Sequence, residues 1–284
     1  MDMLVTPIQR NLKFHLPKNT VSQWNSAGVH VSQFFNTMSL FFPEGERFFI
    51  NSVRHYRDRI MEPELLAAVR AFIGQEAMHG REHDEYNQAM INAGFPVDKM
   101  EAQVTSLLNL IRENSPPAFQ LAITIALEHL TAILADTLLA NPELLDKSDP
   151  NFTALWTWHA LEETEHKAVA YDVFEKVIGT SVQSYLLRTG TLVLATSIFF
   201  ALCYTYYFQI LRTSNEHRNL RGWWQSFKYQ WLKPGAMRKA IPAWLDYFRP
   251  GFHPWDQDNR GYLQQIDALI EKVNTFTPAK EQAA

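Results

Sequence analysis

A glutamate in the middle of an apolar helical stripe constrains the fold of this chain more than any other feature. Glu128 lies in FQLAITIALEHLTAILAD, residues 119–136, where apolar side chains recur at helical spacing. A lone ionised carboxylate on a buried stripe would be very costly, so it must be protonated, paired or bound to a metal. The segment has no Arg or Lys, and His129 is the only nearby pairing partner. We therefore interpret Glu128 as a metal ligand.

Two copies of a Glu-x-x-His spacing supply further candidate ligands, because residues three apart on a helix share one face. His83 and His159 each lie four residues from a member of a pair, so they are additional candidates on the same faces. Two such pairs alone are weak evidence, since short motifs also arise by chance. The pairs are Glu76 with His79, and Glu163 with His166.

The order of these residues along the chain is more informative than their number. Each pair follows a segment that has a lone glutamate on its apolar face, Glu46 in the first case and Glu128 in the second. This order is the ligand set of ferritin-like di-iron and di-manganese carboxylate bundles. Carboxylate and imidazole ligands suit iron or manganese. We therefore expect two metal ions, iron first, with manganese or zinc as alternatives. Glu44 is the alternative metal ligand in the first segment. A competing interpretation is that Glu46 binds no metal and is a negative charge favoured near the N-terminus of a helix.

Several segments together resemble one known family, although none is specific alone. They are SLFFPEGERFF (39–49), QEAMHGREH (75–83), LEHLTA (127–132), HALEETEHKAVAYDVF (159–174) and FRPGFHPW (248–255). In these segments, and over residues 8–275 as a whole, the chain resembles the bacterial family described as predicted metal-dependent hydrolases. The resemblance implies a metal site whose ligands are Glu46, Glu76, His79, Glu128, Glu163 and His166. It implies that His83 and His159 either bind metal as well or support the residues that do.

A second metal hypothesis uses one helix alone. His79, Glu82 and His83 also match H-x-x-E-H, in which two histidines bind one zinc and the glutamate is the general base. This hypothesis leaves Glu46, Glu128 and the second Glu-x-x-His pair unexplained, so the paired site is preferred. We expect the remaining acidic residues near the motifs to be solvated, namely Glu82, Asp84, Glu85, Glu162 and Glu165.

Helical periodicity dominates the chain, and alternating strand patterns are nearly absent. The sequence therefore predicts an all-α fold, a ferritin-like four-helix bundle with an additional long apolar helix and a helical C-terminal extension. One helix is expected over residues 151–177 and a last one over 260–273. The predicted organisation is an irregular arm (1–28), the di-metal bundle (29–180), the apolar helix (181–213), an aromatic-rich helical extension (214–275) and a disordered tail (276–284).

The segment GTLVLATSIFFALCYTYYFQIL, residues 190–211, has no charged residue and is long enough to span a bilayer. Positive charge is heavier after it than before it, which would place the bundle outside the cytoplasm if the segment crossed a membrane. That orientation conflicts with the lack of a secretory signal pattern. The alternatives are a helix buried along the bundle, a homodimer contact, or a membrane-surface contact that includes the basic, Trp-rich stretch after it.

Composition excludes some classes of function. A net charge of −4 gives no basic excess for nucleic acid, and a single cysteine precludes an intramolecular disulfide, which fits a reducing compartment. We expect a cytoplasmic protein, with membrane association as an alternative. The first functional hypothesis is a di-iron oxidoreductase of oxygenase type that acts on a hydrophobic small molecule. The alternatives are a hydrolase that uses a metal-bound water, with Glu82 or Glu162 as base, and a non-enzymatic metal-binding bundle.

Overall fold

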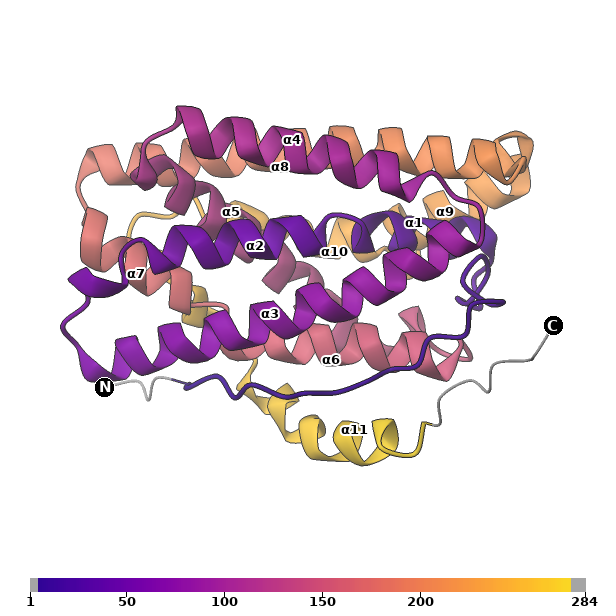
Figure 1. The fold of residues 1–284 in the computed structure, drawn as a ribbon, viewed down its shortest axis with the longest axis horizontal. Coiled ribbons are helices and arrows are strands. Elements are labelled where there is room, and N and C mark those ends of the chain that lie inside the picture. Colours follow the sequence, from indigo (N-terminus) through magenta and orange to yellow (C-terminus); the bar gives the residue numbers. More distant parts are fainter. Residues whose placement is uncertain (1–4, 277–284) are drawn as a thin grey trace.

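The computed structural model describes residues 5–276 of the chain, which form helices and no strand (Figure 1). The prediction of an all-α fold is confirmed, whereas the ferritin-like topology stays a prediction. The α-helices are α1 (Val29–Ser39), α2 (Phe42–Arg54), α3 (Pro63–Asn92), α4 (Val97–Asn114), α5 (Pro117–Ala140), α6 (Pro150–His166), α7 (Val169–Ile178), α8 (Val182–Thr213), α9 (Leu220–Trp231), α10 (Ala236–Asp246) and α11 (Ile266–Val273). The 3₁₀ turns are η1 (Arg57–Arg59), η2 (Pro142–Leu144), η3 (Glu216–Arg218), η4 (Pro254–Asp256) and η5 (Arg260–Gln265).

Local sequence signals fix where the central helices begin. Pro63, Pro117 and Pro150 each occupy the first helical position, where a missing N–H costs nothing. Asp149 caps α6, because its carboxylate accepts hydrogen bonds from the next free backbone amides. After α7, Gly179 adopts a φ of 90°, a conformation that favours glycine at a helix end. These signals set where α3, α5 and α6 begin and where α7 ends.

The single helix predicted over residues 151–177 is wrong in one respect. The helix breaks immediately after His166, and α7 begins at Val169. Neither proline nor glycine marks this break, so helical periodicity passes through it. At the break, Lys167 donates hydrogen bonds to the Gln257 carbonyl (2.6 Å) and to Asn259 Oδ1 (2.8 Å). The last helix also differs from its prediction, because residues 260–265 form a 3₁₀ turn before α11.

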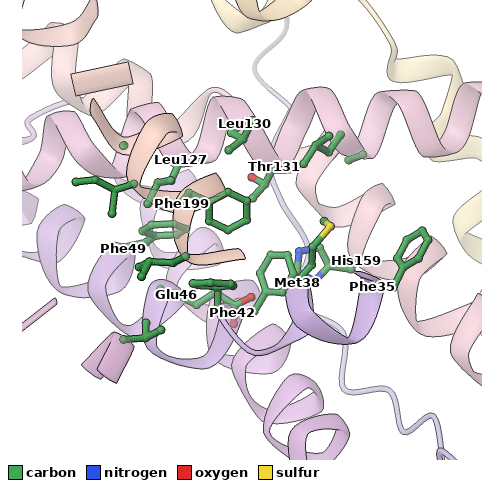
Figure 2. A pocket seen from close by; sticks show the side chains of 18 of the residues that line it. Phe35, Met38, Phe42, Glu46, Phe49, Leu127, Leu130, Thr131, His159 and Phe199 are labelled. Atoms are coloured by element: carbon green, nitrogen blue, oxygen red, sulfur yellow. The ribbon is translucent and has the colours of Figure 1, made fainter. Parts of the chain in front are cut away.

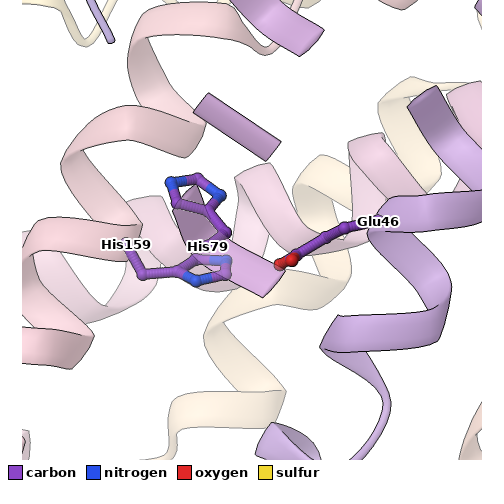
Figure 3. Close-up of side chains that lie close together, drawn as sticks. All are labelled: Glu46, His79 and His159. Atoms are coloured by element: carbon purple, nitrogen blue, oxygen red, sulfur yellow. The ribbon is translucent and has the colours of Figure 1, made fainter. Parts of the chain in front are cut away.

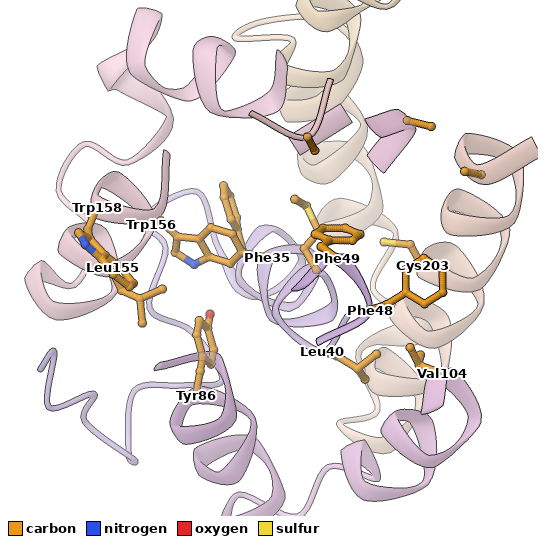
Figure 4. Close-up of a cluster of buried hydrophobic side chains, with 14 of the residues drawn as sticks. Phe35, Leu40, Phe48, Phe49, Tyr86, Val104, Leu155, Trp156, Trp158 and Cys203 are labelled. Carbon is orange, nitrogen blue, oxygen red and sulfur yellow. The ribbon is translucent and has the colours of Figure 1, made fainter. Parts of the chain in front are cut away.

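Four helices form a closed ring, in which α2 packs on α3, α3 on α6, α6 on α5, and α5 on α2. Large side chains fill the space between the elements, and Figure 4 shows Phe48, Phe49, Trp156, Trp158 and the buried Cys203 among them. Because the four helices form a ring, each of them can present one polar face toward a shared interior. Each predicted metal-ligand segment lies on one of these helices.

The N-terminal segment, residues 5–28, contains no helix but belongs to the packed structure. It runs along α3 and α6 in an extended path (Figure 1). Leu12, Phe14, Val21 and Trp24 are all buried in the hydrophobic core. Of the predicted disordered tail, residues 276–284, only Phe276 is among the described residues, and it packs against the hydrophobic core; the rest lies outside them.

Two of the described helices, α5 and α8, are long and apolar enough to cross a membrane by length and composition alone. Core helices of soluble proteins pass the same test, and 67% of the most apolar window of α5 is buried within the bundle. Only 28% of the corresponding window of α8 is buried. Helix α8 packs lengthwise on α5 and α1, so one side of it belongs to the core and the other side is exposed.

Candidate metal centre

The four helices of the ring converge at a buried cluster of carboxylates and imidazoles. Every one of the eight candidate residues is at most 4% exposed, although all are polar or ionisable. Their burial removes the competing interpretation of Glu46 as a solvated helix-terminal charge. The cluster consists of Glu46 from α2, Glu76, His79 and His83 from α3, Glu128 from α5, and His159, Glu163 and His166 from α6.

Within the cluster, three overlapping groups bring one ligand atom from each residue within 4.8 Å of the others. The groups are Glu46 with His79 and His159, Glu76 with His79 and Glu163, and Glu76 with Glu128 and His166. Figure 3 shows the first of these, with the Glu46 carboxylate directed toward the two rings. Because the groups share members, they form a continuous row rather than separate clusters. Seven of the eight candidates belong to at least one group, and His83 belongs to none.

His79 and His166 have the geometry of oriented metal ligands. His79 Nε2 lies 3.1 Å from Glu162 Oε2, and its Nδ1 faces the cluster 4.0 Å from Glu76 Oε1. His166 is arranged the other way round, with Nδ1 hydrogen-bonded to Gln75 Oε1 at 3.0 Å and Nε2 facing the cluster. In protein metal sites, a ligating histidine commonly uses its second nitrogen in such an outer hydrogen bond. The outer bonds therefore select which nitrogen of each ring faces the interior.

His83 and His159 have different surroundings. His159 Nε2 lies 3.1 Å from Glu163 Oε1, and its Nδ1 is hydrogen-bonded to His83 Nε2 at 2.9 Å. The second ring nitrogen of His83 lies 2.8 Å from Ser39 Oγ. Both nitrogens of His83 are thus engaged, which fits a residue that orients His159. The single-zinc hypothesis needs His79 and His83 in one group, and none of the groups within residues 5–276 contains both.

Three acidic residues expected to be solvated are buried instead. Glu162 and Glu165 share Arg10, whose Nη1 lies 3.1 Å from Glu162 Oε1 and 2.9 Å from Glu165 Oε2. The third is Glu82, which pairs with Lys13 and Arg81. The prediction failed because the N-terminal segment supplies basic partners for all three, namely Arg10 for Glu162 and Glu165 and Lys13 for Glu82. Asp84 and Glu85 are exposed as predicted.

Arg10 connects the outer bonds of both oriented histidines. On one side Glu162 contacts His79, and on the other side Glu165 accepts a hydrogen bond from Gln75 Nε2 at 2.6 Å. Gln75 in turn holds His166. The sequence pattern did not identify Arg10 or Gln75 as functional. The position of Gln75, one residue before Glu76, gave a weak signal, whereas nothing in the sequence pointed to Arg10.

Burial and mutual repulsion shift the proton affinities of the cluster. Desolvation, followed by repulsion between the carboxylates, raises the pKa of Glu46, Glu76 and Glu128 well above the usual value. Desolvation also lowers the pKa of His79 well below 6.5. Glu163 is the exception: although burial opposes it, the neighbouring imidazoles of His166 and His159 hold its pKa well below the usual value. The metal-free cluster therefore favours protonated carboxyl groups at Glu46, Glu76 and Glu128, a neutral imidazole at His79 and an ionised carboxylate at Glu163.

The oxygen atoms of the raised carboxyl groups also lack hydrogen-bond partners. Among the described residues, both carboxyl oxygens of Glu46, Glu76 and Glu128 are buried without one, as are His79 Nδ1 and His166 Nε2. His166 Nε2 lies 3.1 Å from Glu76 Oε1, but without hydrogen-bond geometry. Buried polar atoms in native proteins are nearly always satisfied. Unsatisfied carboxylate oxygens and imidazole nitrogens that converge from four helices fit a metal centre, because cations would satisfy them all at once.

Comparison with known proteins agrees with this geometry. A model of the family described as "predicted metal-dependent hydrolase" matches residues 8–258. The chain belongs to this family. The family model ends before α11, so the resemblance expected as far as residue 275 is confirmed only to residue 258. Searches among curated proteins and solved structures give no match. Membership therefore supports a metal-dependent protein with buried candidate ligands, and it does not specify the metal or the number of ions.

The raised carboxyl pKa values predict that the metal-free protein loses stability as pH rises. Folded carboxyl groups with raised pKa values bind more protons than the unfolded chain, so the free energy of unfolding falls as pH rises above about 4.5. The lowered pKa of His79 acts in the opposite direction, but only below about 6.5. We therefore expect the melting temperature of chelator-treated protein to fall as pH rises from about 6.5 to about 8, the value to which burial raises the pKa of Glu162.

Thermal denaturation of metal-free and metal-loaded protein checks this expectation. In metal-free protein, the decline of melting temperature with pH should be smaller for Glu46→Gln, which removes one carboxyl group of raised pKa. It should be unchanged for Glu85→Gln, which alters an exposed carboxylate of α3. Metal loading should flatten the profile, because ligands must lose their protons to bind. A melting temperature that rises over this interval in the metal-free protein would contradict the assigned protonation.

Proposed function

We propose that this chain is a two-metal carboxylate enzyme, with iron as the preferred metal, that oxidises a hydrophobic small molecule with oxygen. The observation that carries the proposal is an apolar cavity of about 300 Å³ that reaches the candidate metal centre. Glu46 and His159 belong to both the cavity wall and the buried cluster. A molecule in this cavity would therefore lie directly against metal ligands.

The chemical character of the cavity indicates the kind of substrate. Figure 2 shows Phe42, Phe49 and Phe199 at the same end of the cavity as Glu46. Leucines and further aromatic residues form most of the remaining wall, and no Arg, Lys, Asn or Gln lines it among the described residues. Such a cavity holds its ligand by burial of apolar surface rather than by polar recognition. A hydrocarbon chain or ring without a charged group fits these walls.

The protein groups have separate tasks in this proposal. Bound metal ions would supply the redox chemistry, as cofactors do in general. Glu76 and Glu163 lie between the two ends of the cluster and would neutralise the charge of two neighbouring cations. Thr131 lines the cavity and donates a hydrogen bond of 2.6 Å to Glu163 Oε2, which holds this carboxylate in place. Burial of the whole cluster excludes bulk water from the reacting region.

Hydrolysis is the second candidate, and the family description favours it. A hydrolase must stabilise negative charge on a carbonyl or phosphoryl oxygen with a metal or with hydrogen-bond donors. The cavity wall offers the hydroxyl groups of Thr131, Thr137 and Tyr229, but each already donates a hydrogen bond, to Glu163 Oε2, the Ile133 carbonyl and the Leu144 carbonyl respectively. The other candidate group is Glu162, whose pKa burial raises to about 8 and which contacts His79. A carboxyl group whose pKa lies this close to neutral pH can both accept and release a proton, as general acid–base catalysis requires.

Oxygen consumption separates the two candidates. Anaerobic protein is loaded with ferrous iron, and medium- and long-chain alcohols, alkanes and fatty esters are then added under oxygen together with a chemical reductant, because insertion of one oxygen atom from O2 consumes two electrons. Substrate-dependent oxygen uptake with an oxidised product supports the proposal. Ester cleavage without oxygen uptake, in protein loaded with zinc or manganese, supports hydrolysis and contradicts the oxidase proposal.

Filling the cavity should impair turnover without removing the metal. Leu127 of α5 lines the cavity, as do Phe199 and Phe49 (Figure 2). We expect Leu127→Trp to lower kcat/KM for an apolar substrate by about tenfold or more, because the ring occupies space that the substrate needs. Metal content should remain that of the unmodified protein. Leu110→Trp, at an exposed position of α4 outside the cavity wall, is the control.

A further inference from the structure

Helix α8 has an exposed apolar stripe along its length. The stripe runs on one side of the helix and carries no charged residue between residues 189 and 211. Its large members include Leu186, Val193, Leu194, Ile198 and Phe208, each between 38% and 62% exposed. Isolated exposed apolar residues are ordinary, but a contiguous stripe usually marks a contact surface.

The stripe is continuous with the cavity. Leu194 and Ile198 are exposed on the stripe and also line the cavity that reaches Glu46 and His159. These two side chains therefore connect the exposed surface of α8 with the wall of the cavity that reaches the candidate metal centre. A substrate that is poorly soluble in water could enter along these side chains without crossing the aqueous phase.

The stripe also continues onto α9. Phe208 near the end of α8 lies 6.4 Å from Trp223, measured between ring centroids. Trp224, the residue after Trp223, stacks on Phe227 with ring centroids 5.8 Å apart, and both side chains are about half exposed. Tryptophan is the residue type most typical of the boundary between water and lipid, because its ring is apolar and its N–H is polar.

The segment that adjoins the stripe is strongly basic, although the whole chain has a net charge of −4. Between residues 212 and 239 the only acidic residue is Glu216. The basic residues of this segment are all exposed, and they are Arg212, Arg218, Arg221, Lys228, Lys233, Arg238 and Lys239. Exposed basic residues beside an apolar face complement a lipid surface, which has anionic headgroups outside and apolar acyl chains beneath them.

From these observations we infer that the α8–α9 face, defined as the α8 stripe with Trp224, Phe227 and the basic residues of 212–239, docks on an anionic lipid bilayer. Docking places the cavity mouth at Leu194 and Ile198 against the acyl chains, from which an apolar substrate enters. The inference rests on the proposed function only for the identity of the substrate that enters the cavity. Helix α8 lies on the bilayer rather than across it, because its opposite side is packed on α5 and α1.

A second copy of the chain fits this face less well. A symmetric dimer brings the same patch of both subunits together. The basic residues of 212–239 would then face their own copies, and like charges repel at short range. An anionic membrane surface has no such repulsion. Docking on a bilayer therefore predicts binding to anionic vesicles, whereas a dimer through this face predicts self-association in solution.

Vesicle sedimentation of the full-length, metal-loaded protein tests the inference. We expect at least about tenfold more protein bound to vesicles of phosphatidylcholine with phosphatidylglycerol than to phosphatidylcholine alone. The double variant Arg221→Glu/Lys228→Glu should lose this preference. Trp224→Ala/Phe227→Ala should weaken binding by about tenfold or more, because it removes inserted apolar surface. Lys18→Glu and Met61→Ala, at exposed positions outside the face, should bind as the unmodified protein does.

Three results would overturn the inference. The first is equal binding to both vesicle types. The second is protein that binds no vesicles but forms a dimer, which the double variant Trp224→Ala/Phe227→Ala dissociates. The third is vesicle-bound protein that neither salt nor alkaline buffer extracts, as expected for a helix that spans the bilayer. Metal content and oxygen uptake in detergent are measured on the same variants. Retained turnover without vesicle binding would leave the proposed function standing, and vesicle binding without turnover would leave the docking standing.

Discussion

Replacing Glu163 by alanine is expected to remove the metal from both ends of the centre. Glu163 forms one group with Glu76 and His79, and its carboxyl oxygens lie 3.1 Å from His159 Nε2 and 3.6 Å from His166 Nε2. Like Glu76, it is thus a carboxylate that adjoins both ends of the row. Removal of residues that merely support metal ligands costs about 10- to 100-fold in affinity, so loss of Glu163 should cost more. Elemental analysis should show about two ions per chain in the unmodified protein and almost none in Glu163→Ala.

Variants at the two ends of the row make this test sharper. Glu46 belongs only to the group with His79 and His159, whereas Glu128 belongs only to the group with Glu76 and His166. Glu46→Ala and Glu128→Ala should therefore each lower the metal content by about one ion, in contrast to Glu163→Ala. Glu85→Ala changes an exposed carboxylate of α3 and serves as the control. Circular dichroism should show retained helix in every variant. Full metal content in Glu163→Ala would contradict the assignment of a shared carboxylate.

Replacing Arg10 by methionine is expected to cause the largest loss of stability. The Arg10 side chain is 11% exposed, and the carboxylates of Glu162 and Glu165 that it joins are 1% and 6% exposed. Removing one partner from a buried ion pair leaves an uncompensated charge and typically costs about 3–5 kcal/mol. Chemical denaturation should show a decrease of this size in the free energy of unfolding. Metal affinity should also fall by about 10- to 100-fold, because the outer bonds of both oriented histidines depend on Arg10.

A matched change at an exposed ion pair provides the comparison. Arg47 is half exposed and lies 3.4 Å from Glu44 and from Asp84, so Arg47→Met should cost no more than about 1 kcal/mol. If Arg10→Met were as mild as Arg47→Met, the proposed role of Arg10 would be wrong. Combining Arg10→Met with Glu162→Gln and Glu165→Gln should recover part of the lost stability, because the unpaired charges are then gone.

Much of the fold could be predicted because helix formation is mainly local. Apolar residues at helical spacing and prolines at first helical positions indicated the helices that carry the candidate ligands. The break after His166 could not be predicted, since it follows from contacts that Lys167 makes with a segment 90 residues later. The ligand candidates were predictable for a related reason. A glutamate such as Glu128 on an apolar stripe needs compensation, whatever the tertiary structure turns out to be.

The sequence alone determined the all-α class and the family resemblance. It also identified polar residues whose burial would be costly unless they bound a metal. Only the tertiary structure decided which acidic residues are buried. Glu162 and Glu165 looked like surface residues, because their partner Arg10 is more than 150 positions away in the chain. The structure likewise separated His83 from the three groups, and joined the α8 stripe to a cavity that ends at Glu46. Helical periodicity is a property of neighbours in sequence, whereas charge pairing, cavities and exposed faces depend on which distant segments meet.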